Sequence, residues 1–163
     1  MGADLYIESI IQPARAQHEP LFYQAVAKRD ACNPGSPEET EAQKEVDELY
    51  NALNPDSGYF RDSYNTTSIL WRLGLSWWDD VVPLQDAEGY LQLEETRILK
   101  DMVSRAPLSL PTAEELRKDG AKVEDAGGNS FGGWHTYYRE KRERLLSFLN
   151  RAIELGEPIR VSL

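Results

Sequence analysis

The stretch "GYFRDSYNTTSILWRLGLSWWDD", Gly58–Asp80, holds the densest group of large side chains in the sequence. Its aromatic residues are interleaved with a short apolar run, and together they offer enough apolar area to form the centre of a core. They are Tyr59, Phe60, Tyr64, Trp71, Trp77 and Trp78. We therefore expect this stretch to dock the helices of the protein on one another, and we refer to it as the aromatic hub.

Two charged residues inside the aromatic hub need an explanation. Arg61 and Asp62 lie among aromatic side chains, where a charge must be paired, hydrogen-bonded or extended to the surface. One interpretation is structural, with Arg61 and Asp62 in a buried ion pair and Asn65 capping a helix that begins at Thr66. The other is a polar pocket with aromatic walls, which is the general form of a ligand site. That pocket would be lined by Arg61, Asp62, Tyr64, Asn65 and Asp79.

The two ends of the chain show the alternation that is typical of β-strands. In "ADLYIESI" (3–10) Leu5 and Ile7 fall on one face, and in "PIRVSL" (158–163) Ile159 and Val161 do the same. Each segment is too short to be stable alone, so we expect the two strands to pair with each other. The chain ends would then form a small sheet within one globular domain that spans residues 1–163.

Between these strands the apolar spacing predicts helices. The clearest covers residues 36–53, where Ser36 can cap, Pro37 fits the first turn and acidic residues follow. Further helices are predicted over 20–31, 66–73, 76–82, 91–103 and 134–155, and a capping box predicts a helix start at Thr112. The sequence thus predicts a mostly helical α+β fold, with a mobile glycine-rich loop at 120–133 that could act as a lid.

The composition restricts the class of partner. The chain of 163 residues has 28 acidic and 18 basic side chains, a formal net charge of −10. Such a charge repels nucleic acid and anionic membranes, so direct binding to either is not expected. No apolar run approaches the ~20 residues that span a bilayer, and the N-terminus lacks a secretory signal pattern. The single cysteine, Cys32, permits no internal disulfide, and we expect a cytoplasmic protein.

The predicted helix over 36–53 concentrates carboxylates on one side. Glu38, Glu41, Glu45 and Glu48 are spaced i, i+3, i+7 and i+10, which places them on one helix face beside an apolar stripe. A row of carboxylates can imitate a phosphate backbone and occupy sites built from lysine and arginine. A solvated helix face explains the same pattern. These four residues are the candidate contact surface for a basic partner protein.

Patterns of catalysis or cofactor binding are few. The two histidines, His18 and His135, leave little room for a histidine-based triad, and no phosphate-binding loop or cysteine–histidine metal motif is present. We therefore predict no cofactor, no metal site and a non-catalytic interaction module of the inhibitor, immunity or nucleic-acid-mimic type. The alternative is a small enzyme or ligand-binding domain that uses the aromatic-walled pocket, with Arg61, Asp62 and His135 as candidate catalytic residues.

Overall fold

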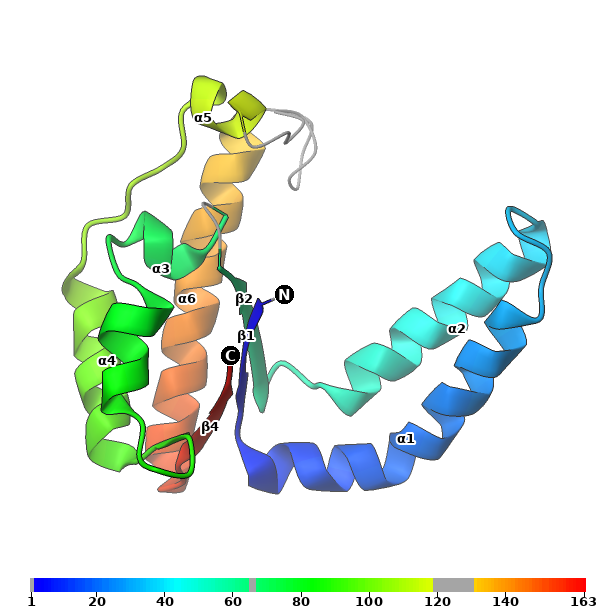
Figure 1. Cartoon of the computed structure of the whole chain (residues 1–163), viewed down its shortest axis with the longest axis horizontal. Helices are drawn as coiled ribbons and strands as arrows, with labels where there is room; N and C mark the ends of the chain where they lie inside the picture. The colour runs from blue at the N-terminus through cyan, green and yellow to red at the C-terminus, as the bar shows by residue number, and fades with distance from the viewer. Residues whose placement is uncertain (1, 65–66, 119–130) are drawn as a thin grey trace. The chain divides into compact units, whose positions relative to one another are not determined.

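The computed structural model describes residues 2–64, 67–118 and 131–163 (Figure 1). The chain divides into two compact units, residues 1–5 with 60–163 and Tyr6–Tyr59. The mostly helical α+β fold, with a small sheet that includes both terminal strands, is confirmed. The single domain over residues 1–163 stays a prediction.

Both ends of the chain belong to one four-stranded sheet with the order β2-β1-β4-β3. Its strands are β1 Gly2–Tyr6, β2 Tyr59–Ser63, β3 Tyr90–Leu91 and β4 Ile159–Ser162. The terminal strands β1 and β4 are neighbours, as their alternation predicted, and Leu5 and Ile159 are fully buried. Gly2 fits in β1 because it has no side chain, since a Cβ there would collide with the Asp62 carbonyl oxygen of β2.

Parts of the sheet differ from the expectation. The first predicted strand, 3–10, ends at Tyr6, and a helix begins at Glu8. The sequence does not predict β2, because the inward position after Phe60 is occupied by the charged Asp62 and the apolar alternation is hidden. It does not predict β3 either, because two residues are too short to show a period. β3 pairs antiparallel with β4, and Tyr90 lies opposite Arg160.

The unit formed by residues 1–5 and 60–163 contains most of the helical segments. They are α3 Ile69–Arg72, a π-helical turn η1 Trp77–Val81, a 3₁₀ turn η2 Val82–Leu84, α4 Leu93–Arg105, α5 Ala113–Lys118 and α6 Phe131–Leu155. The long α6 packs against α3 and α4, and α4 and α6 lie side by side in Figure 1. Leu99 and Val103 of α4 and Leu145 and Leu149 of α6 are fully buried, so this contact is part of the core.

Two predicted helix ends are confirmed by their hydrogen bonds. Thr112 N donates to the Glu115 carboxylate at 2.7 Å and Glu115 N donates to the Thr112 hydroxyl at 3.2 Å, which completes the capping box. After α6, Gly156 has a φ of +70° and Glu157 N donates to Ala152 O at 3.1 Å. This is the Schellman turn that a glycine after the last helical residue favours.

Two helix starts differ from the expectation. The helix predicted over 66–73 begins at Ile69, and α6 begins at Phe131, before the predicted Trp134. The predicted mobile loop at 120–133 lies, up to Ser130, outside the described residues.

The unit Tyr6–Tyr59 is a helical hairpin of α1 Glu8–Asp30 and α2 Pro37–Leu53, which pack side by side (Figure 1). α1 begins well before the predicted 20–31 and continues through Pro13 and Pro20, although each proline removes a backbone hydrogen bond. Packing against α2 maintains the helix there, and Figure 1 shows α1 bent between its ends, as interior prolines favour.

Candidate functional site

The acidic helix α2 begins where the sequence predicts a cap. Ser36 Oγ accepts a hydrogen bond from Glu39 N at 3.1 Å, and Pro37 occupies the first turn. Ala42 and Val46 of α2 are buried, which leaves the carboxylates of the helix on its solvent side. The position of the acidic row is therefore fixed by the apolar stripe next to it.

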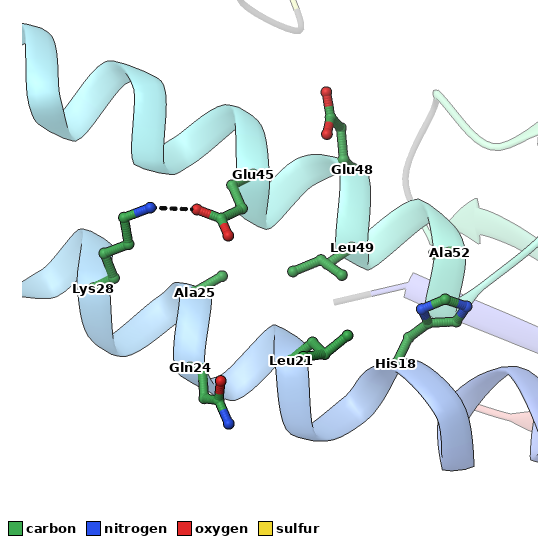
Figure 2. Close-up of a pocket in the computed structure, with 9 residues that line it drawn as sticks. All are labelled: His18, Leu21, Gln24, Ala25, Lys28, Glu45, Glu48, Leu49 and Ala52. Carbon is green, nitrogen blue, oxygen red and sulfur yellow. Dashed lines mark hydrogen bonds and ion pairs between the residues drawn. The ribbon is translucent and has the colours of Figure 1, made fainter.

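An open groove of about 520 Å³ runs between the two helices of the hairpin, and we call it the hairpin groove. Figure 2 shows Leu21 of α1 and Leu49 of α2 directed toward each other across it. The Lys28–Glu45 pair lies toward one end and His18 toward the other. Leu21 is 49% exposed and lines the groove together with Leu49. The groove therefore offers an apolar floor that solvent can reach.

Charged groups at one end of the hairpin groove pair across it. Lys28 Nζ donates to Glu45 Oε2 at 2.7 Å, and both side chains are largely exposed. The hydrogen bond to Glu45, with the attraction of the same carboxylate, raises the pKa of Lys28 above its ordinary value. Because this pair is exposed, its contribution to folding is small. The Lys28–Glu45 ion pair can therefore break at little cost when a partner supplies another cation for Glu45.

The other predicted partner-binding residues lie on the solvent side of α2. Glu41 pairs with Lys44 at 3.0 Å, and Glu38 is exposed in the first turn. Glu48 lines the hairpin groove through its stem, and Figure 2 shows its carboxylate directed away from α1. The four predicted glutamates thus share one helix, and two of them, Glu45 and Glu48, border an apolar groove.

The second candidate site, the aromatic hub, is organised by Asp62. Its side chain is fully buried in β2 and forms an ion pair with Lys141 Nζ of α6 at 2.7 Å. It also accepts hydrogen bonds from Trp77 Nε1 at 2.9 Å, Ile69 N at 3.0 Å and the Ser68 hydroxyl at 2.5 Å. A buried carboxylate is stable only when its oxygens are satisfied in this way. Asp62 therefore joins the sheet, the start of α3, η1 and α6.

Arg61 and Asp62 are not brought together. They are neighbours on β2, where successive side chains point to opposite faces, so Asp62 is buried while the Arg61 side chain is 54% exposed. Arg61 Nε lies 3.6 Å from Asp4 Oδ1 of β1. The structural interpretation of an ion pair between Arg61 and Asp62 is thus corrected, since the partner of Asp62 is Lys141. Sequence reasoning misses Lys141 because it lies far along the chain.

His135 and Asn65 are two further residues that the sequence predicts for the second candidate site. His135 donates from Nε2 to the Pro111 carbonyl oxygen at 3.2 Å near the start of α6. Asn65, predicted as a cap and as a pocket residue, lies outside the described residues. Ser68 caps α3 by accepting a hydrogen bond from Trp71 N at 3.3 Å.

Tyr64 and Asp79 do meet, at a second cavity of about 430 Å³ that we call the tryptophan hollow. Tyr64 lies against Trp78 with the ring centroids 5.9 Å apart, and burial raises the pKa of the Tyr64 phenol. Arg61 and Asp62 do not line this cavity. Two of the predicted pocket residues thus line one cavity, and its role as a ligand site stays a prediction.

The structure adds groove residues that the sequence does not single out. Leu21 and Leu49 fall on the apolar stripes of two predicted helices, where the pattern indicates core. Their partial exposure depends on how closely α1 and α2 approach, and no local pattern encodes that distance. The nearest sequence signal is the position of Leu49 beside Glu45 and Glu48.

A search for metal sites and membrane-spanning helices, and comparison with known proteins, assign no function to this chain. Among the residues that the structure describes, no group of three or more histidine, cysteine, aspartate or glutamate side chains could hold a metal ion. No helix in the described ranges is long and apolar enough to cross a membrane. Comparison of the chain with protein families, curated proteins and solved structures gave no match.

Proposed function

We propose that this protein is an acidic, non-catalytic protein-interaction module that binds a basic partner protein through the α1–α2 hairpin. Inhibitor, immunity-type and nucleic-acid-mimic proteins act in this general way. The observation that carries the proposal is the hairpin groove, an exposed apolar floor bordered by the acidic face of α2. A charged helix face alone would indicate only solubility. An apolar groove beside it adds a surface that another protein can bury.

The charge of the hairpin favours a basic partner. Residues 6–59 contain ten carboxylates but only four lysine and arginine side chains. Three of those four cations, Lys28, Arg29 and Lys44, are already paired with Glu45, Asp30 and Glu41. The remaining negative charge attracts lysine and arginine over a distance of about one Debye length, ~10 Å at 0.1 M salt, and increases the rate of encounter.

The hairpin groove suits an apolar side chain of the partner. Leu21 and Leu49 would contact that side chain, while lysine or arginine residues next to it would reach Glu45 and Glu48. An apolar anchor in a pocket with charged groups at the rim is the usual arrangement of a binding hot spot. The anchor supplies affinity, and the rim charges supply orientation and the rate of association.

The experiment compares two variants of the full chain as bait. In the first, Glu38, Glu41, Glu45 and Glu48 are all replaced by glutamine. In the matched control, the same number of charges is removed elsewhere, by Glu88→Gln, Glu94→Gln, Asp101→Asn and Glu154→Gln. Each bait is incubated at low ionic strength with an extract of cells that naturally express the protein, and the retained proteins are identified.

We expect the wild-type chain and the control to retain the same basic protein, and the α2 variant to lose it. High salt should release that protein, because screening shortens the range of the charges. The proposal fails when the α2 variant retains the same partner as the control, or when retention does not depend on salt.

A second candidate function is a ligand-binding domain, the alternative predicted from the sequence. It is favoured by the tryptophan hollow, where Tyr64 and Asp79 line one cavity. The enzymatic form of that alternative depends on Arg61, Asp62 and His135 acting together, and it stays a prediction, as does the cytoplasmic location.

A further inference from the structure

Two tryptophans of the aromatic hub are exposed rather than buried. Trp71 and Trp78 are 59% and 58% exposed, whereas their neighbour Trp77 is almost fully buried. Both exposed indoles line the tryptophan hollow. Large aromatic surfaces that stay in water are unfavourable for a folded protein, and they commonly indicate a binding surface. The volume of the hollow, about 430 Å³, falls within the range of small-molecule sites.

Hydrogen bonds to Asp62 and Ser76 hold residues that line the hollow. Trp77 Nε1 donates to the buried Asp62 carboxylate at 2.9 Å, and the Ser68 hydroxyl donates to the same group. Ser76 Oγ accepts from Trp78 N and Asp79 N at 3.2 Å each, which fixes the turn that carries Trp78. Trp77 and the backbone that carries Trp78 and Asp79 are therefore fixed before a ligand binds, which lowers the cost of ordering the site.

Asp79 carries the one charge among the described residues that line the hollow, and the Tyr64 hydroxyl is buried there without a hydrogen-bond partner in the described part of the chain. The hydroxyls of Ser68 and Ser76 are already used in helix capping. The Asp79 side chain is exposed and has no hydrogen bond or ion pair within residues 2–64, 67–118 and 131–163. It lines the same cavity as Tyr64 and Trp78, whose ring centroids lie 5.9 Å apart. One free carboxylate beside aromatic rings is complementary to a positive charge.

We infer that the tryptophan hollow binds a small molecule that carries an alkylated ammonium group. The faces of indole and phenol rings attract cations through their quadrupole, and tryptophan does so best. Asp79 adds direct attraction, and the chain-wide charge of −10 raises the local concentration of cations. This site is independent of the hairpin groove and of the proposed protein partner.

Other ligands fit these groups less well. A primary ammonium ion is strongly hydrated and needs several acceptors, whereas the hollow offers one free carboxylate in the described part of the chain. A sugar needs several directional hydrogen bonds, and both serine hydroxyls are occupied. An alkylated ammonium ion loses water readily and contacts ring faces with its methyl groups. It is therefore the cation that this combination selects.

The experiment titrates the full chain with choline and with the neutral alcohol in which carbon replaces the choline nitrogen. The two probes share size and shape and differ in charge. Binding is followed by the indole N–H resonances in a two-dimensional NMR spectrum and by tryptophan fluorescence. We expect choline to bind more tightly than the neutral alcohol by about tenfold, the usual size of a partly desolvated cation–π interaction with a nearby carboxylate.

Variants locate the site. Trp78→Leu should abolish choline binding, and Asp79→Asn should weaken it several-fold while the weak binding of the neutral alcohol stays unchanged. Glu94→Gln removes the same charge at an exposed position of α4, and Tyr23→Leu removes an exposed ring of α1, so both should bind choline like the wild type. Circular dichroism verifies that each variant is folded.

The inference is overturned when choline does not bind, when the neutral alcohol binds equally well, or when Trp78→Leu binds choline like the wild type. Equal binding of both probes would identify an apolar site without selectivity for charge. None of these results bears on the protein partner of the hairpin groove, because the α2 glutamates are unchanged in every variant.

Discussion

Replacing Asp62 by alanine is expected to lower the free energy of unfolding by about 3–5 kcal/mol, the usual result of removing one partner of a buried ion pair. The wild-type carboxylate is fully buried and holds Lys141 at 2.7 Å. In the variant, Lys141 would stay in a nearly buried position without a counter-charge, and the indole N–H of Trp77 would lose its acceptor. Because domains of this size are stable by about 5–15 kcal/mol, the loss is a large part of the total.

The assay is urea unfolding, followed by circular dichroism and by tryptophan fluorescence. With a slope of about 2 kcal/mol per molar urea, the midpoint should fall by about 2 M. The double variant Asp62→Ala, Lys141→Met should be more stable than the sum of the two single losses requires, because it removes both charges. A coupling near zero would show that the two side chains do not interact.

The neighbouring residue supplies the control. Arg61 is largely exposed and lies 3.6 Å from Asp4, so Arg61→Ala should cost no more than about 1 kcal/mol, as for other surface pairs. A loss below about 1 kcal/mol for Asp62→Ala, equal to that of Arg61→Ala, would refute the reasoning, since a buried charge would then be removed without effect.

Further predictions concern three single positions, and each is read from urea unfolding. Tyr138 is fully buried and its hydroxyl has no hydrogen-bond partner in the described part of the chain, so Tyr138→Phe should change stability by less than about 1 kcal/mol. Burial raises the pKa of the Tyr138 phenol above its ordinary value of 10.0, so the unfolded chain loses this proton at a lower pH than the folded chain. The free energy of unfolding of the wild type should therefore fall as the pH rises past 10.0. The fall should be smaller in Tyr138→Phe, which lacks this proton. Ser36→Ala should cost about 1 kcal/mol, because the cap of α2 is lost. Gly156→Ala should cost about 1–2 kcal/mol, because its φ of +70° is unfavourable for alanine and open space surrounds the position.

Features that depend on neighbouring residues could be predicted from the sequence. The caps at Ser36 and Thr112 and the turn at Gly156 are set by hydrogen bonds within a few residues, and each is formed. The alternation of the two terminal strands also indicates their pairing, because two short strands need a partner and both lie at chain ends.

Features that depend on distant packing could not be predicted. The aromatic hub was expected to form the centre of the core, but Trp71 and Trp78 are exposed to solvent while Trp77 is buried. Adjacent tryptophans look alike in sequence, and their exposure is decided by which one reaches Asp62. α1 likewise extends through Pro13 and Pro20, because packing outweighs the local cost of proline.

The candidate sites divide in the same way. The row Glu38, Glu41, Glu45 and Glu48 follows from helical spacing and lies on one helix. The groove beside it requires the approach of α1, and the ion pair of Asp62 requires α6. Local chemistry thus indicates which residues carry charge, and tertiary packing determines what those charges face.

Backbone NMR mapping of the purified partner on the full chain tests the proposed function most directly. Adding the retained basic protein at low salt should shift the amide resonances of Leu21, Glu45, Glu48 and Leu49 around the hairpin groove, and high salt should reverse the shifts. Resonances of α4, which carries comparable acidic residues, should stay unchanged. Shifts confined to α4 or to other acidic segments, with the hairpin groove unaffected, would contradict the account.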